Sequence, residues 1–98
     1  MEVQEAYKQK MAAQLKEWSA QIDLLEAKAK NAGADLRVKR AEELQQLRAK
    51  QRAASEKMKE LGKASGEAWE QVKTTADKIW DDLKTGLAEA HSKFLDHK

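Results

Sequence analysis

Apolar residues recur along the first two thirds of the chain at the spacing of a helix that packs against another helix. From residue 11 onward they follow alternating steps of four and three residues over nearly four heptads. After a stutter of two four-residue steps through Arg40, the pattern resumes at Leu44 and continues to Leu61. It therefore predicts a long helix over about residues 2–61. The first part of this seam comprises Met11, Leu15, Trp18, Ile22, Leu25, Ala29, Ala32 and Leu36.

A second run of apolar positions, from Trp69 to Phe94, predicts another helix over about residues 67–95. Trp80 and Leu95 widen its apolar face beyond a narrow seam. We expect this shorter helix to fold back on the long one as a coiled-coil hairpin. The residues that pack the hairpin would be Leu44, Leu47, Met58, Leu61, Trp69, Val72, Ile79, Trp80, Leu83 and Leu87.

The turn between these two helices is predicted at residues 62–66. Gly62 is able to adopt the left-handed conformation that ends many helices. Ser65 is a residue type that caps the start of a helix, and Glu67 and Glu70 suit the first turn of the next one.

The segment 31–35 leaves two alternatives open. Gly33 could end a helix and Asp35 could begin one, but the following residues 37–40 contain three basic side chains, the wrong sign for a helix start. The apolar stripe also passes through this segment. We therefore expect a continuous helix, with a three-helix bundle broken near residues 31–35 and 62–66 as the alternative.

The continuous helix implies self-association. It would be roughly 90 Å long, so the second helix could cover only about half of it. The remaining seam would expose a long apolar stripe to water, which soluble monomers avoid. We therefore expect a homo-oligomer, a dimer or higher, held together through residues 11–36. Its contact residues would be Met11, Leu15, Trp18, Ile22 and Leu25.

Composition supports a single all-α domain over residues 1–98. Ala, Lys, Glu, Leu and Arg make up 57 of the 98 residues, and proline is absent, so no position is barred from a helix. The net charge is only +2, but residues 34–66 hold nine basic and five acidic side chains. Residues 67–98 hold five basic and seven acidic ones, which suits antiparallel packing of the two segments.

Candidate catalytic chemistry is sparse. The chain has no cysteine, and His91 and His97 lie six residues apart rather than at the four-residue spacing of a helical zinc pair. The adjacent carboxylates of residues 81–82 and 42–43 diverge by about 100° on a helix. We expect no catalytic residues, no cofactor and no metal, and hence no enzyme. The charged first 20 residues and the lack of a membrane-length apolar run predict a cytoplasmic protein.

The sequence fits two other kinds of partner less well than it fits a protein partner. The basic residues at positions 37–52 are interleaved with Glu42 and Glu43, so charged flanks of a coiled coil fit them better than a nucleic-acid interface does. Trp69 and Trp80 lie three helical turns apart, as in helices that bind membrane surfaces. Acidic residues dominate that helix, however, so core packing is favoured, with membrane binding as the alternative.

Three segments resemble a family of small bacterial coiled-coil proteins associated with salt and general stress responses. They cover Tyr7–Lys30, residues 34–61 and residues 65–87, with the most specific motifs at Leu15–Ala29, Gly66–Trp69 and Trp80–Lys84. The resemblance implies a non-enzymatic structural or protein-interaction protein and carries over no functional residues. The alternatives are an amphipathic protective protein at membrane surfaces and an accessory helical subunit of a larger complex.

Overall fold

The computed structural model describes residues 2–96 of the chain, and the side chains of residues 3–94. It contains three α-helices, α1 (Glu2–Lys30), α2 (Ala34–Lys63) and α3 (Gly66–Asp96), and no strand in the described part. This confirms the all-α prediction.

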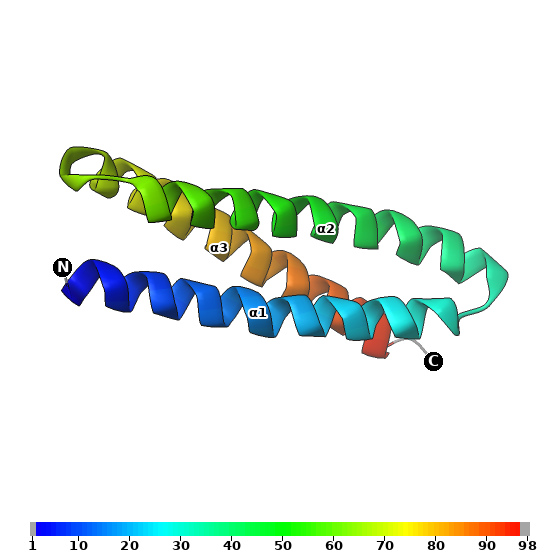
Figure 1. Cartoon of the computed structure of the whole chain (residues 1–98). Helices are drawn as coiled ribbons and strands as arrows, with labels where there is room; N and C mark the ends of the chain where they lie inside the picture. The colour runs from blue at the N-terminus through cyan, green and yellow to red at the C-terminus, as the bar shows by residue number, and fades with distance from the viewer. Residues whose placement is uncertain (1, 97–98) are drawn as a thin grey trace.

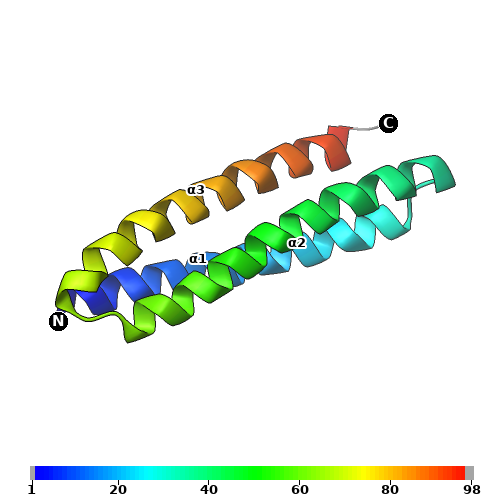
Figure 2. The same cartoon turned by 90° about the horizontal axis from the view of Figure 1, so that it is seen from above.

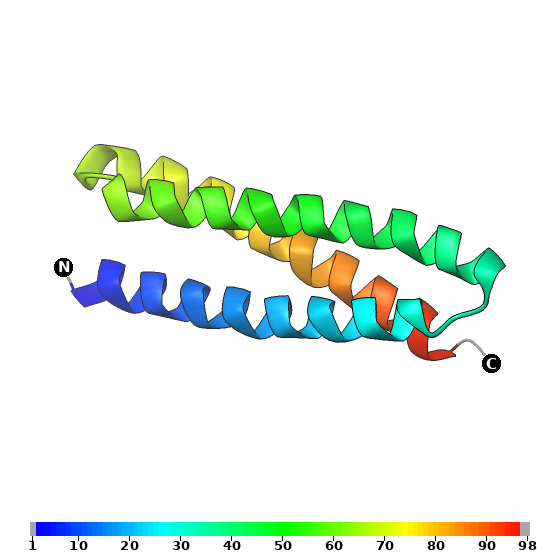
Figure 3. The same ribbon diagram turned by 45° about the vertical axis from the view of Figure 1, so that its right-hand side comes forward.

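The three helices form one elongated unit of 50 × 18 × 16 Å. α1 and α2 run antiparallel, and α3 turns back to cross obliquely beside both of them (Figure 1). Figure 2 shows the same arrangement from above, and Figure 3 shows it with the right-hand side of Figure 1 turned forward. Every pair of helices is in contact, and α1 packs less extensively on α3 than α2 does on either neighbour.

The first turn interrupts the long helix that the apolar pattern predicts. The N–H groups of Asn31 and Ala32 donate to carbonyls three residues back, both at 3.1 Å, which tightens the end of α1. Gly33 is extended, with φ −62° and ψ 163°, and its carbonyl accepts from the N–H of Arg37 at 2.8 Å. By turning here, the chain covers the apolar stripe of α1 with its own α2 and α3.

The second turn is shorter than predicted. α2 continues through Gly62, which does not take the predicted left-handed conformation. The connection is made at Ala64, with φ −68° and ψ 134°, whose N–H donates to the carbonyl of Glu60 at 2.9 Å. The carbonyl of Ser65 then accepts from the N–H of Trp69 at 2.7 Å and starts α3. Extended backbone, rather than a glycine conformation, reverses the chain.

One apolar core contains side chains from all three helices. Its fully buried members include Ile22, Leu25, Leu61 and Leu83. Of the residues predicted to contact a second chain, Met11, Ile22 and Leu25 are buried here, and Leu15 and Trp18 are half-buried against the core. Of the predicted hairpin positions, the buried ones are Leu44, Leu47, Leu61, Trp69, Trp80, Leu83 and Leu87. The half-buried ones are Met58, Val72 and Ile79.

Gly86 lies where α3 packs against Leu47 and Lys50 of α2. A Cβ atom at this position would lie 3.1 Å from Nζ of Lys50 and 3.6 Å from Cδ2 of Leu47. The missing side chain therefore lets the two helices pack closely around Leu47, which is 3% exposed. The predicted hairpin positions did not include this glycine.

Adjacent leucines in α1 test the orientation of that helix. Leu25 is 1% exposed and Leu24 is 59% exposed. We expect Leu25→Ala to lower the free energy of unfolding by about 2–5 kcal/mol, because it leaves a cavity in the core. Leu24→Ala should change it by less than about 0.5 kcal/mol. Urea denaturation measures both, and equal losses would contradict the orientation of α1.

Candidate functional site

A polar cluster around Arg48 joins α1 to α2. Nη2 of Arg48 donates to carboxylate oxygens of Asp23 and Glu26, each at 2.9 Å. Nη1 donates to the amide oxygen of Gln51 at 3.0 Å, and the Gln51 amide in turn donates to the hydroxyl of Ser19 at 2.7 Å. The hydrogen bond that Arg48 donates to Asp23 is the main reason that the pKa of Arg48 is raised. The cluster fixes the register of the two antiparallel helices.

A second cluster, around Arg40, joins the start of α2 to the end of α3. Arg40 is 8% exposed. It donates to Glu43 at 2.7 Å and to the carbonyl of Lys93 at 3.1 Å, and it lies 4.9 Å from the ring centre of Phe94. Burial alone would raise the pKa of Glu43, but hydrogen bonds and positive charge from Arg40 and Lys93 outweigh it, so this pKa lies below 4.5.

A third cluster, around Tyr7, joins the start of α1 to α3. The Tyr7 hydroxyl donates to Asp77 at 2.5 Å, and its ring meets the ring of Trp69 edge-on with centres 5.6 Å apart. The ammonium group of Lys73 lies 5.2 Å from the centre of the Tyr7 ring. Burial, followed by the hydrogen bond to Asp77 and its negative charge, raises the pKa of Tyr7 well above its ordinary value of 10.0.

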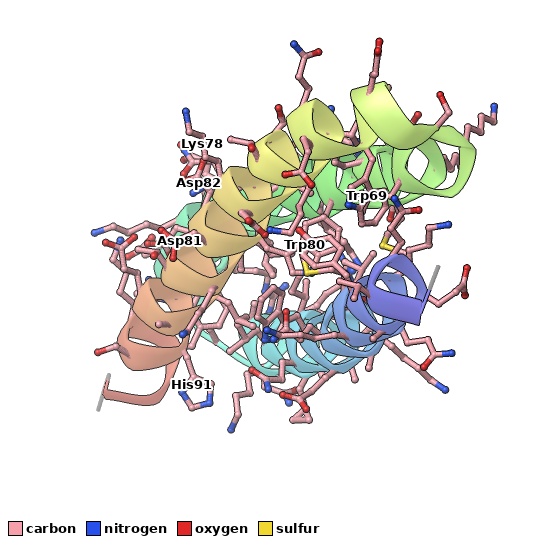
Figure 4. The ribbon with its side chains drawn as sticks, turned by 90° about the vertical axis from the view of Figure 1, so that its left-hand side faces the viewer. Trp69, Lys78, Trp80, Asp81, Asp82 and His91 are labelled. Atoms are coloured by element: carbon pink, nitrogen blue, oxygen red, sulfur yellow. The ribbon has the colours of Figure 1, made fainter. Side chains whose placement is uncertain are left out.

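Trp80 adds a buried hydrogen bond between α3 and α1. Its indole N–H donates to the backbone carbonyl of Met11 at 3.2 Å. Figure 4 shows Trp69 and Trp80 pointing between the helices, whereas Lys78, Asp81 and Asp82 point away from them. The tryptophans considered as a membrane-binding pair therefore belong to the interior of the folded chain.

All three of these pKa shifts strengthen the ordinary charge state at neutral pH. Tyr7 and Arg48 hold their protons more tightly, and Glu43 loses its proton more readily. Such shifts suit stable ion pairs and hydrogen bonds between helices. A general acid or base would instead need a pKa near the working pH.

The residues considered for metal or acid–base chemistry are not brought together. Asp81, Asp82 and His91 are exposed on α3, and His97 lies outside the described residues, as does the side chain of Leu95. Within the described part, no group of three His, Asp or Glu side chains is placed to hold a metal ion. No helix in that part is long and apolar enough to cross a membrane.

An open groove of about 460 Å³ lies between α1 and the second half of α3. Trp18, half-buried, lines it from α1, and the buried Leu87 lines it from α3. Lys84 is exposed at this groove and forms no ion pair with the described residues. The full lining is Trp18, Gln21, Lys84, Leu87, Ala88 and His91.

A second hollow, between α1 and α2, differs from this groove in the side chains that line it. It has a volume of about 570 Å³ and is lined in part by Leu44, Glu26 and Arg48. The last two are already paired with each other. Arg52 also lines this hollow, so a basic side chain does not distinguish the two sites. Only the groove at Trp18 has an aromatic ring in its lining, and it is therefore the better candidate for binding a partner.

The comparisons with known proteins find nothing similar to this chain: no family model, no curated protein and no solved structure matches it.

Sequence reasoning singled out Trp18 but not the groove, because Lys84 and His91 reach it from a helix far along the chain. It treated Arg40 as a break in the heptad pattern and as one of the basic residues at positions 37–52, but not as a buried contact. The position of Arg40 in line with Leu36 and Leu44 was a usable signal, since a long charged side chain at a seam position must find a partner.

The ionisation of Tyr7 tests the α1–α3 contact. Because the folded-state pKa is raised, the fold favours the neutral phenol, and this stabilisation is lost as pH rises above 10.0 through the folded-state value. We expect tyrosinate absorbance to appear only well above pH 10.0, and Asp77→Asn to move the midpoint back toward it. The chain has one tyrosine, so the signal is unambiguous. A wild-type midpoint at 10.0 would contradict the contact.

Proposed function

We propose that this chain is a non-enzymatic helical interaction protein that binds an amphipathic helix of a partner protein in the groove around Trp18. The observation that carries the proposal is the half-buried indole of Trp18 in an open groove beside Lys84, which is unpaired among the described residues. Tryptophan is enriched at the energetic centres of protein interfaces because it buries a large apolar area.

The shape of the groove favours a helix as the bound element. α1 and α3 run in the same direction on either side of it (Figure 1). An amphipathic helix that lies along such a groove buries apolar side chains at positions spaced three and four residues apart. One of these apolar side chains of the partner helix would cover Trp18 and Leu87.

The charge at the groove favours acidic residues on the partner helix. Lys84 offers an ammonium group, and the exposed ring of His91 offers an N–H donor. A carboxylate one turn from the buried apolar side chain would reach Lys84. Rim charges of this kind govern specificity and association rate more than affinity.

The non-enzymatic part of the proposal rests on the contacts of the polar side chains, which bond one helix to another. Arg40, Arg48 and Tyr7 hold pairs of helices together. The proposed role matches the small structural or protein-binding helper that the resemblance to stress-associated coiled-coil proteins implies.

The test is a fluorescence titration with a synthetic, tryptophan-free amphipathic peptide that carries leucine on one face and glutamate on the other. Trp69 and Trp80 are only 4% and 3% exposed, so Trp18 is the indole that a ligand reaches. We expect the acidic peptide to shift the Trp18 emission to shorter wavelength, and Trp18→Phe to abolish the shift. A matched peptide with lysine in place of glutamate should bind more weakly.

Charge reversals on α3 supply the matched control. Lys84→Glu should weaken binding of the acidic peptide roughly tenfold. Lys78→Glu makes the same change on a side chain that points away from the other helices (Figure 4) and should leave binding unchanged. Equal effects of the two reversals, or no binding of the acidic peptide, would overturn the proposal. A Trp18 shift with anionic vesicles in place of the peptide would support the membrane-surface alternative.

A further inference from the structure

We propose that this chain exchanges α1 between two copies, forming a dimer in which residues 31–33 straighten and α1 and α2 become one continuous helix. The partner is a second copy of the same chain. Each α1 leaves its own α2 and α3 and occupies the same place on those of the other copy. The inference goes beyond the proposed function, since the groove at Trp18 is built from α1 and α3 in both forms.

The first observation is that the turn at residues 31–33 is weakly determined. Gly33 has no side chain to cap the free N–H groups at the start of α2, and no side-chain cap is formed there. Its φ of −62° lies in the ordinary range, so no conformation special to glycine holds the turn. Asp35 is the only acidic residue in the first turn of α2, and Arg37 and Arg40 follow it closely. A continuous helix would remove this unfavourable start.

The second observation is that the apolar stripe is already in register for a continuous helix. It passes through Ala29, Ala32 and Leu36 at steps of three and four residues. Residues 31–33 contain no proline, and a side chain at Gly33 would meet no atom within 4 Å. Nothing in the sequence of the turn prevents it from becoming helical.

The third observation is that the exchange retains the contacts between the helices. The Arg48–Asp23 ion pair, the Tyr7–Asp77 hydrogen bond and the hydrogen bond from Trp80 to Met11 all join α1 to another helix. Each would form between copies instead of within one. The two forms therefore differ mainly at the turn and in the entropy of association, which makes such exchange a low-cost route to a dimer.

Two substitutions at Gly33 shift the equilibrium in opposite directions. Gly33→Ala favours the continuous helix, because alanine has a higher helix propensity than glycine. The gain applies at both turns of the dimer, so the dimerisation constant should rise about 30-fold. Gly33→Pro should suppress the dimer, because proline breaks a helix interior. Proline fits the folded turn, since φ is −62° and the N–H of Gly33 donates to no backbone acceptor in the described residues.

Cross-linking distinguishes exchange from any other dimer. The side chains of Ser19 and Gln51 touch across α1 and α2, and the chain has no cysteine of its own. In a Ser19→Cys, Gln51→Cys variant, a short bis-maleimide cross-linker joins the two thiols and spans the distance that the longer Gln51 side chain covers in the wild type. An exchanged dimer is then linked between chains and stays dimeric in denaturing gels. A monomer, or a dimer without exchange, is linked within one chain.

The experiment is refolding of the full chain at low and high concentration, followed by sedimentation analysis and cross-linking. We expect a dimer of the wild type at high concentration, cross-links between chains in the Ser19→Cys, Gln51→Cys variant, more dimer for Gly33→Ala, and a helical monomer for Gly33→Pro. Dimers that persist in Gly33→Pro, cross-links confined within single chains, or a Gly33→Ala variant that stays monomeric would each overturn the proposal. Peptide binding at Trp18 is scored separately and does not depend on this result.

Discussion

The apolar stripe of α1 is the constraint on which the rest of the structure depends. Ile22 and Leu25 on this helix are almost fully buried, at 0% and 1% exposed. Both other helices contact α1, α2 through the hydrogen bond from Arg48 and α3 through the hydrogen bond from Trp80. The two turns bring α2 and α3 back onto this stripe. They also leave α1 and α3 parallel, with the groove between them.

Polar side chains then select one arrangement among those that bury the same apolar area. Each pair of helices has its own hydrogen-bonded cluster, at Arg48, Arg40 and Tyr7. Arg40 lies on the apolar stripe between Leu36 and Leu44, at the stutter in the heptad pattern, and it donates to a carbonyl near the end of α3. A buried charge with good partners adds little net stability, but removing one partner is costly, so such groups penalise wrong registers.

Periodicity predicted the helical residues and most of the core, because helical spacing is a local property. It placed a break near residues 31–35 only as the alternative, since these residues are compatible with a helix and tertiary packing decides their conformation. The prediction that α2 ends at Gly62 was wrong, because glycine permits a helix end without requiring one. The helix continues through Gly62 to Lys63. The groove was beyond prediction because Trp18 and Lys84 are 66 positions apart and meet only through the order of the helices.

An odd number of antiparallel helices sends the chain in at one end of the molecule and out at the other. The first residues of α1 and the last of α3 lie at opposite ends of the long axis in Figure 1. Anything joined covalently at these two ends would be held apart along an axis of 50 Å. The bundle therefore has the geometry of a spacer that holds its N-terminal attachment at one end and its C-terminal attachment at the other.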